Sequence, residues 1–230
     1  MSADLIETAA AALGPVAADV VFLGAATICL WISDRAAPET RATSDVDVIS
    51  AVVGKAGYYQ LGEQLRERGF SEASDSNVIC RWKHAETGLV LDAMPTEEAV
   101  LGFSNRWYDH AIRTAVELTL PSEVKIRAAT PPSIIATKLA AWHGRGNKDM
   151  LRSLDLHDIL VLVDGREELL KEIRDEPTLS SYISNELAKL RANPHFTYLV
   201  ESALHGYGAL IARRAEEVHR RIDAIVASAN

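Results

Sequence analysis

Two aspartates with strand spacing carry the strongest chemical signal in this 230-residue sequence. Asp45 and Asp47 lie in the alternating run Asp-Val-Asp-Val-Ile, and side chains two apart on a strand point to the same face. Neighbouring carboxylates repel one another unless a cation lies between them, and ligand sets made only of oxygen favour Mg²⁺ or Mn²⁺. The alternative is a pair of solvated carboxylates on an exposed strand face, because Asp-x-Asp is a common pattern.

Asp92 favours the metal site over this alternative. It follows Gly-Leu-Val-Leu in a strongly apolar predicted strand, where a charge without a partner is costly to bury. A third carboxylate on a neighbouring strand would complete a two-metal site, which stabilises both the attacking and the leaving oxygen. The competing role for Asp92 is to cap a helix that begins at Pro95.

Small and basic residues elsewhere could bind phosphate. Gly24, Ala25 and Ala26 follow an apolar run at a predicted strand-to-helix junction, where backbone N–H groups can approach an anion. Farther along, Lys138 and Arg145 lie on one face of a predicted helix. The lysine would bind a triphosphate as a point charge, and the arginine would bind it through bidentate hydrogen bonds.

Two further aspartates could orient this lysine. Asp155 and Asp158 lie three apart, on one face of the next predicted helix, and could hold Lys138 in position. The alternative is a solvated pair of helices joined by salt bridges.

The elements that must position these residues change in character near residue 130. The predicted strands cover residues 17–23, 45–50, 78–83, 89–94, 116–120 and 123–128, with helices at 25–32 and 55–68. After Pro131-Pro132 only helical spacing remains, over residues 133–143, 154–163, 167–174, 179–191 and 208–227. This order predicts an α+β fold, with a small mixed β-sheet and helices in residues 1–130 and an all-helical part in residues 131–230.

The first half resembles the nucleotidyltransferase core of the DNA polymerase beta type. The resemblance lies in a strand ending at Gly24, a short helix, and the run Arg41-Ala-Thr-Ser-Asp45-Val-Asp47. In that superfamily a Gly-Gly or Gly-Ser pair opens the phosphate site, Asp-x-Asp binds two metals and a later strand supplies a third carboxylate. Ala25 and Ala26 depart from this pattern, so the resemblance implies backbone contacts to the phosphates but not hydroxyl contacts.

The second half narrows the resemblance. The run Lys138-Leu-Ala-Ala-Trp-His-Gly-Arg145, continuing through residues 146–149 to Asp155-Leu-His-Asp158, is similar to the AbiEii-type nucleotidyltransferases. These include toxins of type IV toxin–antitoxin systems and the related MenT toxins, and in them a helix lysine and a downstream aspartate motif complete the active site. The resemblance covers roughly residues 20 to 165.

The resemblance assigns roles residue by residue. It implies that the catalytic residues are Asp45, Asp47, Asp92, Lys138 and Asp158, and that the metal ligands are Asp45, Asp47 and Asp92. It implies nucleotide contacts from Gly24, Ala25, Ala26, Arg41, Lys138, Arg145 and Asp155. The helical domain would thus contribute Lys138 and the pair Asp155/Asp158 to the site.

The expected function is metal-dependent transfer of a nucleoside monophosphate from an NTP to an acceptor hydroxyl. The cofactor would be Mg²⁺ or Mn²⁺ and the NTP would be a co-substrate. The leading acceptor is RNA, at the tRNA 3′ end, because toxin relatives modify RNA, and a cognate antitoxin is a further expected partner. The alternatives are a small-molecule transferase, as in antibiotic-modifying relatives, and a non-catalytic binding module that keeps the fold.

Charge and compartment agree with this expectation. The net charge of −8 excludes a broad basic surface, and all of its excess lies in residues 1–100, which contain the three aspartates. Cys29 and Cys80 lie in apolar surroundings, as reduced thiols in a cytosolic protein do. The acidic N-terminus is unlike a secretory signal, and the longest apolar run, residues 20–32, is too short to span a bilayer. The sequence therefore predicts a cytoplasmic protein without a membrane segment.

Overall fold

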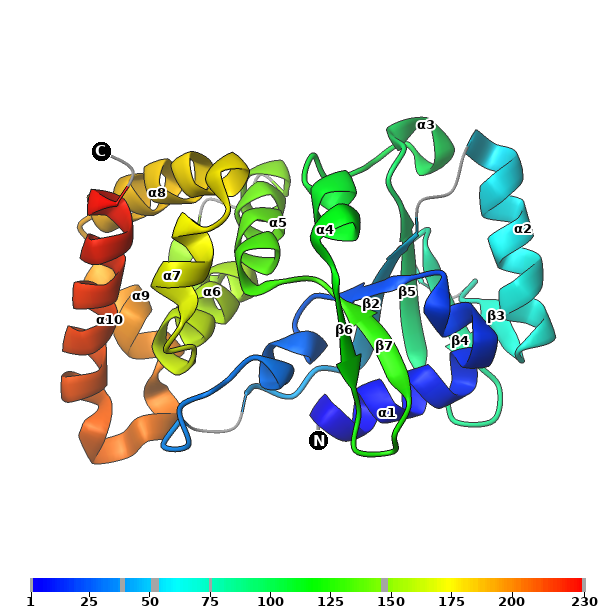
Figure 1. Cartoon of the computed structure of the whole chain (residues 1–230), viewed down its shortest axis with the longest axis horizontal. Helices are drawn as coiled ribbons and strands as arrows, with labels where there is room; N and C mark the ends of the chain where they lie inside the picture. Colours follow the sequence, from blue (N-terminus) through cyan, green and yellow to red (C-terminus); the bar gives the residue numbers. More distant parts are fainter. Residues whose placement is uncertain (1, 38–39, 51–53, 75, 146–148, 229–230) are drawn as a thin grey trace. The chain divides into compact units, whose positions relative to one another are not determined.

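The computed structural model describes residues 2–37, 40–50, 54–74, 76–145 and 149–228, which fall into two compact units (Figure 1). One unit comprises Met1–Thr27 and Arg41–Thr130, and contains the sheet. The other comprises Ile28–Thr40 and Pro131–Asn230, and contains the C-terminal helices.

Part of the N-terminal half of the sequence belongs with the helices. The N–H groups of Ser33 and Asp34 both donate to the carbonyl of Gly165, at 2.9 and 3.0 Å. The Asp34 carboxylate also pairs with Arg214 in the last helix. These contacts explain why residues 28–40 group with the helical unit, whereas the sequence reading placed them with the sheet.

The sheet has seven strands in the order β3-β4-β5-β2-β1-β7-β6. The strands are β1 (Val21–Leu23), β2 (Asp45–Ser50), β3 (Phe70–Glu72), β4 (Arg81–His84), β5 (Val90–Pro95), β6 (Val116–Thr119) and β7 (Lys125–Ala128). β2 is parallel to β5 and β1 is parallel to β7, whereas the remaining neighbours are antiparallel. The sheet is therefore mixed, with β2 near its centre.

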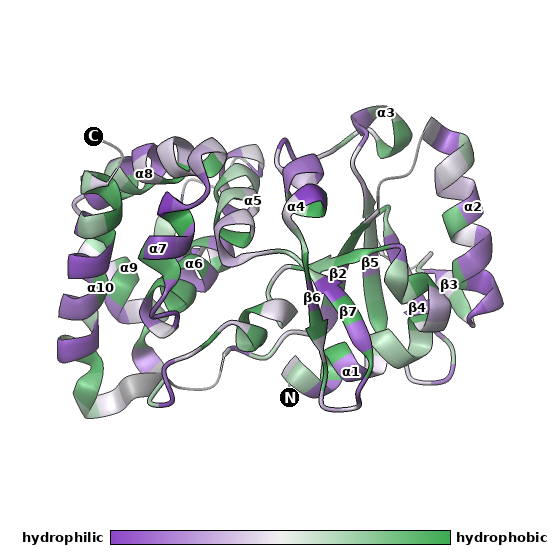
Figure 2. Cartoon of the chain, viewed as in Figure 1, coloured by the Kyte–Doolittle hydropathy of each residue, from purple (hydrophilic) through white to green (hydrophobic). Residues whose placement is uncertain are grey.

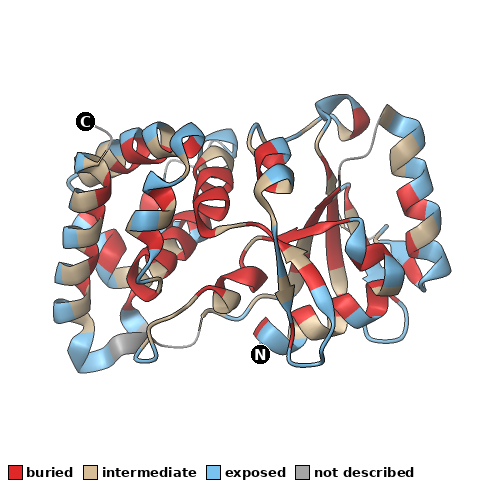
Figure 3. Ribbon diagram, viewed as in Figure 1, coloured by how far each residue is buried: buried red, intermediate tan, exposed pale blue. Residues whose placement is uncertain are grey.

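The alternation in β2 decides which of its faces is buried. Val46 and Val48 are at most 1% exposed and point into the core, beside Leu91 and Ala93 of β5 in register. Because successive side chains alternate, Asp45 and Asp47 point to the opposite face, where both are half-buried. The buried strands at the centre of the sheet are visible in Figure 3.

Helices surround this sheet within its unit. They are α1 (Ser2–Leu13), the 3₁₀ helix Gly14–Ala18, α2 (Gly54–Glu67), α3 (Glu98–Leu101) and α4 (Tyr108–Thr114). A further 3₁₀ helix, Ala26–Leu30, begins in this unit and ends in the other. Helix α2 buries Leu61 and Leu65, one turn apart, and exposes charged residues on its outer side (Figure 2).

The second unit is built from helices alone. They are α5 (Pro131–Gly144), a 3₁₀ turn at Met150–Arg152, α6 (Leu154–Gly165), α7 (Leu169–Arg174), α8 (Pro177–Arg191), α9 (Phe196–Ala203), a 3₁₀ segment at His205–Leu210 and α10 (Ile211–Ala227). Helix α10 buries Val218, Ile222 and Ile225 at i, i+4 and i+7 and packs along α6, α8 and α9. This spacing explains the two-sided colouring of α10 in Figure 2.

The predicted fold class is confirmed, with differences at element ends. The predicted strand over residues 17–23 shortens to β1, because Gly14–Ala18 forms a 3₁₀ helix with a proline at its start. The helix predicted over residues 25–32 is the 3₁₀ helix Ala26–Leu30, and β3, α3, α4 and α9 were not predicted. Among the described helices, none is long and apolar enough to cross a membrane.

Candidate functional site

The three predicted carboxylates lie on one face of the sheet. Asp45 and Asp47 come from the same face of β2, and Asp92 of β5 pairs in register with Asp47. Asp92 is only 7% exposed, so its carboxylate needs a partner. The alternative that Asp92 caps a helix is wrong, because the residue lies inside β5.

Arg81 of β4 is that partner. Its Nε donates to Asp92 Oδ1 and its Nη2 donates to Asp92 Oδ2, both at 2.8 Å, so the two side chains form a bidentate ion pair. The same Nη2 also donates to Asp45 Oδ2, at 2.8 Å. Because one nitrogen contacts both carboxylates, the two oxygens can lie no farther apart than twice that distance. Arg81 therefore joins two of the three predicted carboxylates.

The sequence reading missed Arg81, although the signal was present. The predicted hairpin turns around Glu86-Thr87-Gly88, and β4 and β5 are antiparallel with Arg81 opposite Asp92. Counting outward from Glu86 and Thr87 gives this register directly. A basic residue opposite a buried aspartate is a favourable cross-strand pair.

Charge in the cluster affects its neighbours. The hydrogen bonds to Asp92 raise the pKa of Arg81, so its guanidinium stays charged. Burial, reinforced by the charge of Asp92, raises the pKa of the adjacent Cys80 thiol to about 12. Thr43 donates to the other oxygen of Asp45, Oδ1, at 2.7 Å, so both oxygens of Asp45 accept a hydrogen bond.

Gly24 is required by the position of Asp47. A Cβ at position 24 would lie 1.9 Å from Asp47 Oδ2, far inside van der Waals contact. The backbone of Gly24 also has φ +79°, a left-handed conformation that side chains disfavour. Thr27 Oγ1 donates to the Gly24 carbonyl at 2.9 Å and stabilises this turn. The glycine therefore makes room for a carboxylate.

The other residues predicted at the phosphate side are described only in part. Ala25 is 7% exposed and Ala26 is fully buried, so both side chains are packed. The helix after Gly24 is the short 3₁₀ helix Ala26–Leu30. Arg41 is half-buried in the irregular segment before β2. Phosphate contacts from these residues stay a prediction.

A second charged cluster lies in the helical unit. Lys138 Nζ donates to Asp158 Oδ2 at 2.7 Å and lies 3.6 Å from Asp155 Oδ1. Arg145 donates to the other oxygen of Asp155 at 2.8 Å. The side chains of Lys138 and Asp158 are 9% and 3% exposed, so this pair is buried, whereas Arg145 is 68% exposed. The two aspartates thus hold Lys138 in place. Salt bridges join the two helices, as the alternative also expects, but the Lys138–Asp158 pair is buried and not solvated.

Helix geometry explains the second cluster. Asp155 and Asp158 lie one turn apart at the start of α6, and Lys138 projects from α5, which packs against it. Ser153 caps α6 by accepting from the Leu156 N–H at 3.3 Å, which fixes the first turn. Residues 146–148, between the two helices, lie outside the described residues.

The two clusters belong to different units, and each is described by itself. Asp45, Asp47, Asp92 and Gly24 lie in the sheet unit. The prediction that Lys138, Arg145, Asp155 and Asp158 serve the same active site stays a prediction.

The carboxylate cluster fits a divalent cation in part. Asp45 and Asp47 offer oxygen ligands from one strand face, and the Gly24 turn leaves the space that the Asp47 carboxylate fills. Within the part of the chain that the structure describes, no group of three or more His, Cys, Asp or Glu side chains is gathered to hold a metal. The position of Arg81 between Asp45 and Asp92 provides a physical reason for this.

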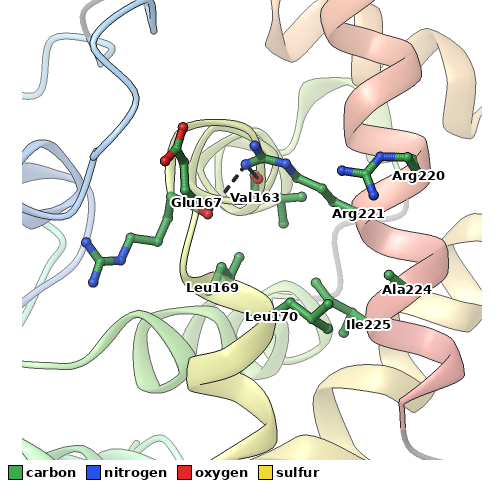
Figure 4. A pocket seen from close by; sticks show the side chains of 9 residues that line it. Val163, Glu167, Leu169, Leu170, Arg220, Arg221, Ala224 and Ile225 are labelled. Carbon is green, nitrogen blue, oxygen red and sulfur yellow. Dashed lines mark hydrogen bonds between the residues drawn. The ribbon is translucent and has the colours of Figure 1, made fainter.

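A cavity of about 130 Å³ lies within the helical unit (Figure 4). Arg220 and Arg221 of α10 line it together with Glu167 and apolar residues of α6 and α7. Arg221 Nη1 donates to the Val163 and Asp164 carbonyls, at 3.0 and 2.8 Å. The arginine thereby satisfies carbonyls at the end of α6. None of the predicted site residues lines this cavity.

Part of this chain matches the model of a known protein family. A protein crystallised as an antigenic nucleotidyltransferase-like protein from Paracoccidioides brasiliensis is 17% identical, with a TM-score of 0.44 over 79% of this chain and 91% of the other. A search of curated proteins finds no match. Residues 91–197 match the family model described as "Nucleotidyl transferase AbiEii toxin, Type IV TA system". The resemblance seen in the sequence is therefore confirmed, and residues 91–197 carry the AbiEii nucleotidyltransferase signature.

Proposed function

We propose that the protein is a metal-dependent nucleotidyltransferase that moves a nucleoside monophosphate from an NTP to a hydroxyl of RNA, at the tRNA 3′ end. The family match over residues 91–197 supports nucleotidyl transfer as the activity. The observation that carries the proposal is the placement of Asp45, Asp47 and Asp92 on one sheet face, with Gly24 shaped around Asp47.

In the proposed reaction, the acceptor oxygen forms a bond to the α-phosphorus and the bond between the α-phosphorus and the α–β bridging oxygen breaks. Pyrophosphate leaves, and the proton of the acceptor hydroxyl passes to Asp92. Each oxygen of an ionised carboxylate has two acceptor positions, so Asp92 keeps capacity beyond the hydrogen bonds from Arg81. A divalent cation held by Asp45 and Asp47 would neutralise charge on the α-phosphate and the leaving group.

The basic residues of the helical unit would bind the rest of the triphosphate. Lys138 carries three N–H donors, and one of them donates to Asp158. Arg145 is exposed, and one nitrogen of its guanidinium donates to Asp155. The remaining N–H groups of the guanidinium can donate to two oxygens of a phosphate. Gly24 and the amides after it would contact phosphate through the backbone, and Arg41 would add a charge.

The proposal is tested with radiolabelled NTPs, Mg²⁺ and total RNA, comparing the wild type with Asp47→Asn. We expect the wild type to label a tRNA-sized band and the variant to lose at least about 10²-fold of the rate, since charge stabilisation by a bound cation is large. Equal labelling by both proteins would overturn the proposal. Labelling of an aminoglycoside-like compound but not of RNA would assign the small-molecule alternative.

The family description also motivates a test in cells. Because the matched family is described as a toxin of a type IV system, we propose that expression slows growth and that a cognate antitoxin restores it. The Asp47→Asn variant should be harmless at the same expression level. Equal growth arrest by the wild type and the variant would separate toxicity from nucleotidyl transfer.

A further inference from the structure

The carboxylate cluster contains a cation of its own. Arg81 is fixed to Asp92 by two hydrogen bonds and to Asp45 by a third, all of 2.8 Å. Together with Asp47, the four charged side chains sum to a formal charge of −2, which one divalent cation neutralises. The resemblance, in contrast, implies two divalent cations among three carboxylates.

The pairing of Arg81 with Asp92 follows from the sheet itself. The two residues face one another across the antiparallel strands β4 and β5. The Arg81 side chain is 26% exposed and that of Asp92 is 10% exposed. Moving the guanidinium away would leave a carboxylate in a mostly buried position, and breaking a buried ion pair is strongly unfavourable. The pair is therefore expected to persist when substrates bind.

We propose that the Arg81 guanidinium permanently takes the place of one of the two divalent cations, so that the nucleotide-bound protein holds a single divalent cation, on Asp45 and Asp47. This inference rests on the proposed function and concerns the same site. Arg81 is a positioning residue for Asp92 and a fixed positive charge beside Asp45. Asp92 then serves as a hydrogen-bond acceptor and not as a metal ligand.

The number of bound cations can be measured without turnover. The protein is loaded with a non-hydrolysable NTP analogue and Mn²⁺, and electron paramagnetic resonance is recorded together with the bound Mn²⁺ per chain. Two ions in a site of this class lie roughly 3.5–4 Å apart and would be magnetically coupled. We expect the wild type to bind one ion per chain and to give an uncoupled spectrum.

Variants identify Arg81 as the cause. Arg81→Met should admit a second ion and produce the coupled spectrum. The double variant Arg81→Met/Asp92→Leu should again bind one ion, since replacing a buried ion pair with apolar residues is often tolerated. Lys83→Ala is the matched control: Lys83 is an exposed basic residue on the same face of β4, and its removal should leave the count at one.

The outcomes separate this inference from the proposed function. A coupled pair in the wild type, or a single ion in Arg81→Met, would overturn the role of Arg81 and leave nucleotidyl transfer standing. Loss of the ion in the double variant would likewise overturn it, because Asp92 would then be a metal ligand. If neither the wild type nor any variant binds more Mn²⁺ than the NTP analogue binds in the absence of protein, the proposed function fails together with the inference.

Discussion

Replacement of Gly24 by alanine tests how the fold shapes the site. The new Cβ would lie 1.9 Å from Asp47 Oδ2, so the carboxylate or the turn must move by roughly 1 Å to reach an allowed contact. A displacement of that size in a catalytic group costs on the order of 10²-fold in rate. The positive φ adds a conformational cost of about 1 kcal/mol to folding.

Gly102 provides the matched control for this substitution. It has the same φ of +79°, but a Cβ there would meet nothing within 4 Å. Gly102→Ala should therefore lose about 1 kcal/mol in urea unfolding and Gly24→Ala at least as much, and only Gly24→Ala should lose about 10²-fold in NTP-dependent labelling of RNA. Full activity in Gly24→Ala, or an equal loss of activity in Gly102→Ala, would refute the reasoning.

Three further predictions concern other charged and buried groups. Asp158→Ala leaves the buried Lys138 without its closest partner and should cost about 3–5 kcal/mol in urea unfolding, whereas Lys138→Met/Asp158→Leu should recover most of it; a loss below about 1 kcal/mol in the single variant would contradict a tight pair. Hydrogen bonds from Arg220 and Arg221 lower the pKa of Glu217 from 4.5 to about 2. Its stabilisation is thus present above pH 4.5 and lost as the pH falls towards 2, so Glu217→Gln should flatten that part of the pH–stability curve, and an unchanged acid limb would count against the pairing. Cys80, 2% exposed with its pKa raised to about 12, should resist iodoacetamide at about pH 8 in the folded protein and react in urea; rapid labelling of the native protein would show that the thiol is accessible.

Local periodicity was enough to predict the strand that carries the aspartates. The alternation of Asp45 to Ser50 gave the bounds of β2 as they are observed, because one face of the strand is buried and the other carries the carboxylates. The spacing of Lys138, Asp155 and Asp158 likewise predicted contacts that two packed helices form. These features depend on residues near one another in the sequence or on one helix pair.

The features that sequence reading missed depend on register and on tertiary contacts. Arg81 can be recognised as the partner of Asp92 only when β4 and β5 are aligned residue by residue. The grouping of residues 28–40 with the helices depends on Asp34, which pairs with Arg214 far away in the sequence. Neither pairing leaves a periodic signal in its own segment. The Arg81–Asp92 pair follows from the register of the predicted hairpin, whereas no local pattern reveals the contact between Asp34 and Arg214.

Both cysteines lie in the described part of the chain, and neither is in a disulfide. Cys80 is buried, as its apolar surroundings in the sequence predicted, whereas Cys29 is only half-buried. The difference arises because Cys80 precedes β4, where its carbonyl accepts from the Ala93 N–H inside the sheet. Cys29 is therefore less buried than the apolar residues around it in the sequence predict.

The central claim is that the chain transfers a nucleotidyl group, and the position of the label in the NTP tests it most directly. The purified protein is incubated with Mg²⁺, tRNA and NTPs labelled at either the α- or the γ-phosphate. Nucleotidyl transfer places the α-label on the RNA and releases the γ-label in pyrophosphate, and Asp47→Asn should abolish both signals. Transfer of the γ-label to the RNA, or α-labelling that survives in Asp47→Asn, would contradict the account.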